Sequence, residues 1–158
     1  MASSSAPRPA VAADAGASLV DEIRAALPDL RLLTDATDRE SYRNDETAYL
    51  HAGLPVAVAL PETTAEVSTL VRLAAARRVP IVPRGAGSGL SGGAAGIDGG
   101  LTIAMTRMNR VLEIDRENLV VVTQPGILNA DLKAAVAAEG LFYAPDPASY
   151  EICSIGGN

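Results

Sequence analysis

Cysteine, histidine and aromatic residues are scarce in this chain of 158 residues. One Cys and one His exclude an internal disulfide and a metal centre built from several Cys or His ligands. Aromatic residues make up 3% of the chain and Trp is absent, so the core must be aliphatic. A net charge of -6 is the opposite of what binding to nucleic acid or an anionic membrane requires. No apolar run approaches the ~20 residues of a membrane-spanning helix, so no transmembrane segment is predicted.

The first 17 residues are rich in Ala, Ser and Pro and carry Arg8 as their only cation. They contain neither the apolar segment of a secretory signal nor the several arginines of an organelle transit peptide, so we expect a disordered tail over residues 1–17. A helix capped by Ser18 opens a lead-in, residues 18–52, whose second half shows no clean period and is expected to be irregular. We assign residues 53–158 to one further domain.

Apolar runs separated by turn residues predict strands at 56–60, 81–82 and 101–105. A helix between the first two strands begins after Thr63, whose side chain forms a capping box with Glu66. Strand, helix and strand within about thirty residues make a βαβ unit, so the two strands should be parallel.

The last third of the chain predicts a smaller antiparallel part. Apolar runs at 111–115 and 119–123 flank a short polar turn, which is typical of a hairpin. A helix capped by Asn129 ends at Gly140, and residues 141–143 are expected to form a last short strand. The fold class is therefore α+β, close to α/β, with a βαβ unit and a mixed sheet.

A stretch rich in glycine, Ile81 to Gly93, begins with the second strand. Gly87, Gly89 and Gly92 have the spacing G-x-G-x-x-G. Successive backbone N–H groups in such a loop can form a concave nest that binds an anion, and Arg84 is expected at its mouth. We interpret the stretch as a cradle for phosphate, first of all for a dinucleotide pyrophosphate. A flexible surface loop is the alternative, but it would carry more polar residues.

Two common nucleotide-binding motifs do not fit this loop. The Rossmann fingerprint requires the glycines to open a helix whose N-terminus receives the pyrophosphate. Here Gly93, Gly96, Gly99 and Gly100 precede the next strand and leave no room for a helix. A P-loop requires Gly-Lys followed by Ser or Thr, which the chain lacks.

Three stretches in this order resemble the FAD-binding domain of the p-cresol methylhydroxylase (PCMH) type, which vanillyl-alcohol oxidase and the FAD-linked D-lactate dehydrogenases share. They are the strand and Pro-x-Thr-x-x-Glu pattern at 55–66, the glycine-rich loop at 83–93, and Pro145-Asp146-Pro147 with residues 153–158. Within this family the chain is similar to the branch of the FAD-linked subunit of glycolate oxidase and D-lactate dehydrogenase. Because the chain stops in mid-motif at Asn158, we expect an N-terminal fragment whose FAD domain is truncated.

The resemblance implies that the glycine loop wraps the FAD pyrophosphate, that Gly126 lets the backbone approach the cofactor, and that the C-terminal motif lies beside the flavin. The implied cofactor-binding residues are Pro83, Arg84, Gly85, Ala86, Gly87, Ser88, Gly89, Leu90, Ser91, Gly92, Gly93, Gly126, Pro145, Asp146, Ser149, Cys153, Ser154, Ile155, Gly156, Gly157 and Asn158. In relatives with covalent flavin, a His in the glycine loop bonds the ring. Ser88 occupies the comparable place here, so the resemblance implies non-covalent FAD.

The resemblance further implies a flavoprotein oxidoreductase that oxidises a small 2-hydroxy acid such as glycolate or D-lactate. Catalytic histidines of the family lie in a later substrate domain, so this chain is expected to contain no catalytic residue, to bind FAD weakly or not at all alone, and to show no turnover. It implies a cytoplasmic location, and an iron–sulfur or other electron-acceptor subunit that could hold the protein at the inner membrane. A different flavoenzyme on the same domain, similar to alkyl-glycerone-phosphate synthase or to a sugar oxidase, and a non-enzymatic nucleotide-binding domain are the alternatives.

Three other features have simpler explanations. His51 is interpreted as a surface or packed residue. Cys153 has no cationic neighbour in the sequence that would activate its thiol, so we expect a small buried or flavin-adjacent side chain. Asp45 and Glu46 are interpreted as a solvated pair rather than as an acid–base pair.

Overall fold

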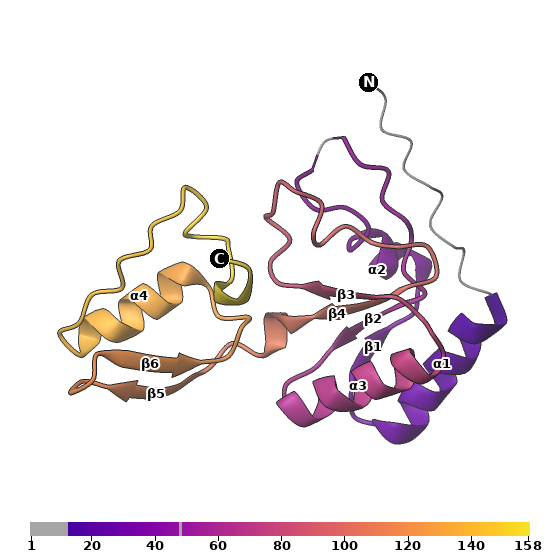
Figure 1. Cartoon of the computed structure of the whole chain (residues 1–158), viewed down its shortest axis with the longest axis horizontal. Coiled ribbons are helices and arrows are strands. Elements are labelled where there is room, and N and C mark those ends of the chain that lie inside the picture. The colour runs from indigo at the N-terminus through magenta and orange to yellow at the C-terminus, as the bar shows by residue number, and fades with distance from the viewer. Residues whose placement is uncertain (1–12, 48) are drawn as a thin grey trace.

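The computed structural model describes residues 13–47 and 49–158, which form two lobes (Figure 1). The first lobe contains α1 (Ala13–Ala26), β1 (Arg31–Leu33), α2 (Ala36–Glu40), β2 (Ala57–Leu60), α3 (Thr64–Ala76), β3 (Ile81–Arg84) and β4 (Leu101–Ala104). The second contains β5 (Val111–Asp115), β6 (Val120–Thr123), α4 (Asn129–Ala138) and the short 3-10 helix η2 (Ile155–Gly157), and η1 (Met105–Arg107) connects the lobes. Within these residues, none of the helices is both long and apolar enough to cross a membrane.

The sheet of the first lobe has the strand order β1-β2-β4-β3. β2, β4 and β3 run parallel, and β1 pairs antiparallel with β2 at one edge. The predicted βαβ unit and the mixed sheet are thereby confirmed, with β4 inserted between the two strands of the unit. Every residue of β2 and of β4 is buried, as expected for central strands that are covered on both faces.

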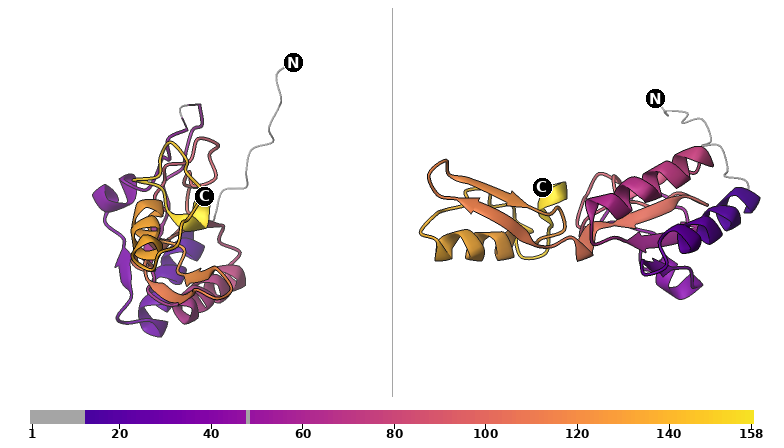
Figure 2. Two further views of the ribbon diagram at one scale, coloured as in Figure 1. Left: turned by 90° about the vertical axis from the view of Figure 1, so that its left-hand side faces the viewer. Right: turned by 90° about the horizontal axis from the view of Figure 1, so that it is seen from below.

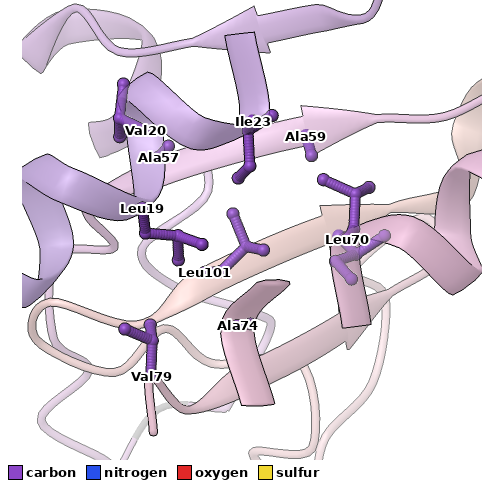
Figure 3. Close-up of a cluster of buried hydrophobic side chains, with 10 residues drawn as sticks. Leu19, Val20, Ile23, Ala57, Ala59, Leu70, Ala74, Val79 and Leu101 are labelled. Carbon is purple, nitrogen blue, oxygen red and sulfur yellow. The ribbon is translucent and has the colours of Figure 1, made fainter. Parts of the chain in front are cut away.

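Successive side chains of β2 point to opposite faces of the sheet, and each face has its own core. Figure 2 shows α1 and α3 running together along the first lobe, and the two helices are in contact. The cluster between these helices and the sheet is drawn in Figure 3 and contains Leu19, Val20, Ile23, Ala57, Ala59, Leu70, Ala74, Val79, Leu101 and Ile103. On the other face, Val58 and Leu60 pack with Tyr42 of the lead-in. The part of the lead-in around Tyr42 therefore packs on the face of the sheet opposite to α1 and α3.

Several local predictions are confirmed. Thr63 and Glu66 form the capping box of α3: Thr63 Oγ1 accepts from Glu66 N at 3.2 Å, and the Glu66 carboxylate accepts from Thr63 N at 3.0 Å. β5 and β6 form the predicted antiparallel hairpin, with an irregularity between Val111 and Glu113. Gly140 follows the end of α4 at φ +75°, the left-handed conformation that favours glycine after a helix.

The N-terminal predictions need correction. α1 begins at Ala13, so Ser18 lies inside the helix and does not cap it. Alanine has the highest helix propensity, and the alanines before Ser18 favour a helix that begins within the expected tail of residues 1–17. Residues 1–12 of that tail lie outside the described residues. The lead-in is also more regular than predicted, because it contains β1 and α2. Asp35 caps α2, with its Oδ1 accepting from Thr37 N at 2.8 Å. An edge strand and a short exposed helix bury little apolar surface and therefore leave a weak periodic signal.

Two predictions in the second lobe are also wrong. Leu128, not Asn129, is the N-cap of α4; Asn129 is the first helical residue and is fully buried. Residues 141–143 form no strand. Leu141 and Tyr143 pack against the core of the second lobe, while Phe142 is 85% exposed. Residues 141–143 therefore bury alternate side chains against the core that α4 helps to form, and they do so without pairing in a sheet.

Candidate functional site

A cavity of about 550 Å³ lies at the junction of the two lobes. The glycine loop of the first lobe and the C-terminal turn of the second meet there (Figure 1). The lining residues are Pro83, Arg84, Gly85, Ala86, Gly87, Ser88, Gly89, Leu90, Ser91, Gly93, Ala94, Met105, Pro125, Ser149, Cys153, Ser154, Gly156, Gly157 and Asn158. The loop leaves the carboxyl end of β3, and ligands of α/β sheets bind at the carboxyl ends of parallel strands.

The glycine loop has a run of free backbone donors. Within the described residues, the N–H groups of Gly87 to Gly93 have no hydrogen-bond partner. Gly87 and Gly92 adopt φ +82° and +76°, which glycine tolerates without strain. At Gly89, no atom lies within 4 Å of the position that a Cβ would take. Free N–H donors around an open cavity fit the negative charge and the acceptor oxygens of a pyrophosphate.

Arg84 lines the cavity, but it is buried in the wall and does not lie at the mouth, where the sequence predicts it. The residue is 8% exposed, and its Nη1 donates to Asn44 O at 2.9 Å and to Ala94 O at 3.0 Å. The guanidinium lies over the ring of Tyr42, 5.6 Å from the centroid. Burial lowers the pKa of Arg84, and the charge of Asp45 opposes part of this effect. Arg84 alone is charged among the described residues that line the cavity.

Asp45 is not the solvated carboxylate that the sequence suggested. Its Oδ1 accepts from Thr47 N at 3.0 Å, and its Oδ2 accepts from Ala94 N at 3.4 Å. Partial burial raises the pKa of Asp45, but hydrogen bonds from Thr47 and Ala94 and the charge of Arg84 outweigh it, so the pKa is lowered. Glu46 is exposed, as predicted. The difference arises because Asp45 lies against the end of the glycine loop, which is distant in sequence.

Ser154 attaches the glycine loop to the second lobe. Its hydroxyl is buried and accepts from Ala86 N at 3.1 Å. A Cβ at Gly85 would lie 2.0 Å from Ser154 Oγ, so a larger residue there would displace the hydroxyl. Ser154 also pairs with Leu128 in an isolated β-bridge next to α4. One side chain thus holds the two walls of the cavity together.

Five residues with implied cofactor roles do not line the cavity: Gly92, Gly126, Pro145, Asp146 and Ile155. At Gly126, a Cβ would lie 1.9 Å from the carbonyl oxygen of Met105, so the close approach is to the chain's own backbone. The carboxylate of Asp146 pairs with Lys133 on α4, and Ile155 packs in the core of the second lobe. A role of these residues toward FAD stays a prediction, and each has another contact in the structure.

Three lining residues were not predicted from the sequence: Ala94, Met105 and Pro125. Met105 follows β4, whose carboxyl end lies beside that of β3 in the parallel sheet. The rule that ligands bind at the carboxyl ends of parallel strands could have identified it. Ala94 and Pro125 have no chemical signature, and only the fold places them at the cavity.

His51 and Cys153, the reactive side chains outside the glycine loop, lie where the sequence predicts them. His51 is exposed, as predicted. Cys153 is buried at the cavity, with its Sγ 3.8 Å from Asn158 Oδ1. Among the residues that the structure describes, no group of three or more His, Cys, Asp or Glu side chains could hold a metal ion.

A family model for the FAD binding domain matches residues 55–158. Glycolate oxidase subunit GlcD of Bacillus subtilis (strain 168) is 46% identical over 108 residues, which cover 68% of this chain and 23% of the relative. D-lactate dehydrogenase of Anaerostipes hadrus is 38% identical over 128 residues, which cover 81% of this chain and 27% of the relative. The chain thus spans about a quarter of the length of these curated relatives.

Solved structures share the arrangement of both lobes. An alkyldihydroxyacetonephosphate synthase superposes with a TM-score of 0.80 at 28% identity, over 98% of this chain and 30% of the synthase. p-Cresol methylhydroxylase with substrate bound superposes with a TM-score of 0.72 at 22% identity, over 83% of this chain and 26% of that enzyme. At that identity the second likeness concerns the fold alone, and it confirms the predicted fold class.

Proposed function

The chain belongs to the family of FAD binding domains, and from that premise we propose that it forms the FAD-pyrophosphate-binding part of an oxidoreductase that oxidises a small 2-hydroxy acid, glycolate or D-lactate. The observation that carries the proposal is the run of unpartnered N–H groups from Gly87 to Gly93, which lies beside the cavity and within the matched residues.

The roles of the residues follow from where they lie. N–H groups of the glycine loop hold the two phosphates, and Arg84 forms part of the wall of the cavity. Ser149 and Cys153, with residues 156–158, form the opposite wall and orient the flavin. FAD supplies the two-electron redox chemistry when it is bound. No His lines the cavity among the described residues, which supports non-covalent binding.

The names of the two curated relatives support a 2-hydroxy acid as the substrate. The likeness to alkyldihydroxyacetonephosphate synthase favours the second candidate, another flavoenzyme on the same domain, at a lower identity of 28%. A cytoplasmic enzyme that passes electrons to an iron–sulfur or other acceptor subunit completes the proposal.

Cofactor binding is tested by titrating the chain with FAD and following flavin fluorescence, with Gly89→Asp and Gly89→Asn as a matched pair. Both side chains enter the same open space and have nearly the same size, and only that of Asp carries a negative charge. We expect weak saturable binding by the natural chain and a dissociation constant about tenfold higher for the Asp variant than for the Asn variant, because a carboxylate repels the phosphates. Equal constants for the two variants would exclude an anion at this loop.

The manner of binding and the substrate need separate experiments. After acid denaturation of the FAD complex, the yellow colour should stay in solution; colour in the pellet would show a covalent bond. For the substrate class, residues 55–158 replace the matched segment of the Bacillus subtilis relative, whose other parts are kept. We expect this chimera to retain FAD and to oxidise glycolate or D-lactate. A chimera that retains FAD and oxidises neither would show that this segment does not place the flavin for the oxidation of a 2-hydroxy acid. Turnover by residues 1–158 alone would contradict the assignment of catalytic residues to other parts of the enzyme.

A further inference from the structure

Arg84 makes its hydrogen bonds at the base of the glycine loop. It is the last residue of β3, and its Nη1 donates to Ala94 O at 3.0 Å, on the far side of the loop. The same nitrogen donates to Asn44 O at 2.9 Å, in the lead-in. Arg84 therefore joins the start of the loop, its end and the lead-in.

Asp45 completes the closure from the lead-in side. Its Oδ2 accepts from Ala94 N at 3.4 Å, so both polar backbone atoms of Ala94 are bound, one by Asp45 and the other by Arg84. Its Oδ1 accepts from Thr47 N, which fixes the carboxylate in place. The lead-in residues 44–47 lie outside the segment 55–158 that the family model matches. A segment upstream of the match therefore makes direct hydrogen bonds with the FAD binding domain of this chain.

The loop itself has few means of keeping its shape. The N–H groups from Gly87 to Gly93 have no partner among the described residues. A Cβ at Gly87 would lie 2.2 Å from Arg84 Nη2, and one at Gly92 would lie 1.9 Å from Leu50 Cδ1, so the side chains of Arg84 and Leu50 fill the space next to these two glycines. Glycine loses the most conformational freedom on ordering, and a loop held in shape before binding avoids that cost at the binding step.

We propose that Asp45 and Arg84 form a clamp around Ala94 that holds the glycine loop in its cofactor-binding shape, and that Arg84 is a positioning residue rather than a ligand of the pyrophosphate. The proposal rests on the proposed FAD function for its effect on affinity. The burial of Arg84, the two carbonyls bound by its Nη1 and the ring of Tyr42 that covers the guanidinium all support the positioning role.

The clamp is tested with Asp45→Asn and a matched control, Asp35→Asn. Asp35 makes the same local contact, an Oδ1 that accepts from the N–H two residues on, but it is exposed and belongs to the cap of α2. Hydrogen exchange of the amides of residues 94–96 is measured without cofactor, and the FAD dissociation constant is measured by titration. We expect faster exchange and a dissociation constant at least about tenfold higher in Asp45→Asn, since a charge-assisted hydrogen bond is lost. The control should match the natural chain in both measurements.

Arg84→Gln separates positioning from direct contact with phosphate. If Arg84 only positions the loop, Arg84→Gln weakens FAD binding but leaves the salt dependence of the dissociation constant unchanged, since no charge contact with the phosphates is lost. A clearly shallower salt dependence would overturn the positioning role. Unchanged exchange and unchanged affinity in Asp45→Asn would overturn the clamp. Failure of the chimera with the Bacillus subtilis relative to retain FAD would reject the proposed function, and the exchange rates of the natural chain without cofactor would still decide whether the clamp exists.

Discussion

Replacing Gly85 and Ser154 by alanine, singly and together, tests the attachment between the lobes. Ser154→Ala removes the hydroxyl that accepts from Ala86 N and leaves that partly buried N–H without a protein partner. Gly85→Ala should have the same effect by a different route, because its Cβ would lie 2.0 Å from Ser154 Oγ and force the hydroxyl to rotate away. Gly85 is not among the residues of positive φ, so alanine there meets no backbone strain.

The expected magnitudes follow from the one hydrogen bond involved. A part-buried hydrogen bond beside a cavity contributes about 0.5–1.5 kcal/mol net, so each single variant should lower the free energy of unfolding by that amount. The double variant should lose about the same amount and not the sum, since the bond can be lost only once. Without the hydroxyl, the Cβ at position 85 would meet only the Cβ of residue 154, at an ordinary 3.4 Å.

Urea unfolding of the natural chain and the three variants measures this coupling. With a slope of about 1–3 kcal/mol per molar urea, each single variant should shift the midpoint downward by about 0.5 M, and the double variant should unfold at nearly the same midpoint as Ser154→Ala. Additive losses in the double variant would refute the inference that Gly85 and Ser154 act through the same hydrogen bond. An unchanged midpoint in Ser154→Ala would refute the importance of the attachment itself.

Three further predictions concern the cap of α3, the acidic side chains and two glycines. Thr63→Ala removes the capping hydroxyl and should lower the free energy of unfolding by about 1 kcal/mol in urea titration; no change would argue against the capping box. Hydrogen bonds hold the pKa of Asp45 and Asp115 below 3.8 in the folded chain, so their contribution is present above that pH and lost as the pH falls through the lowered values. The melting temperature should therefore fall on acidification below about pH 4, and less steeply in Asp115→Asn; equal slopes would contradict this. Gly126→Ala should prevent normal folding because its Cβ meets a backbone carbonyl oxygen at 1.9 Å, whereas Gly89→Ala should keep the melting temperature and weaken FAD binding; normal melting of the first or unchanged affinity of the second would contradict these roles.

Local signals predicted the regular elements that depend on neighbouring residues. The capping box at Thr63, the stop at Gly140 and the hairpin of β5 and β6 are formed by groups within a few residues of each other, and the structure confirms them. The helix cap at Asn129 failed because the side chain is taken into the fold: it is fully buried and its amide donates to Pro145 O at 3.5 Å. Tertiary burial can thus override a short-range capping preference.

The candidate site divides in the same way. Its glycine loop was identified from composition and spacing, since a run of glycines is needed where backbone N–H groups must stay free around an anion. Arg84 was identified as well, but the prediction that it lies at the mouth was wrong, because its hydrogen-bond partner in the lead-in, Asn44, is 40 residues away in sequence. Asp45 was set aside as a solvated side chain, and only its distance from Ala94 in space gives it a role.

The sequence by itself determined the family, the βαβ order and the glycine loop, because each depends on residue types at short and regular spacing. Tertiary structure alone decided that Ser154 attaches this loop to the second lobe, that Asp45 closes its base, and that Gly126 packs against the backbone at Met105. These contacts join segments that are separated by tens of residues. Such contacts depend on how sheet and helices place distant segments together, and no local pattern of residues records them.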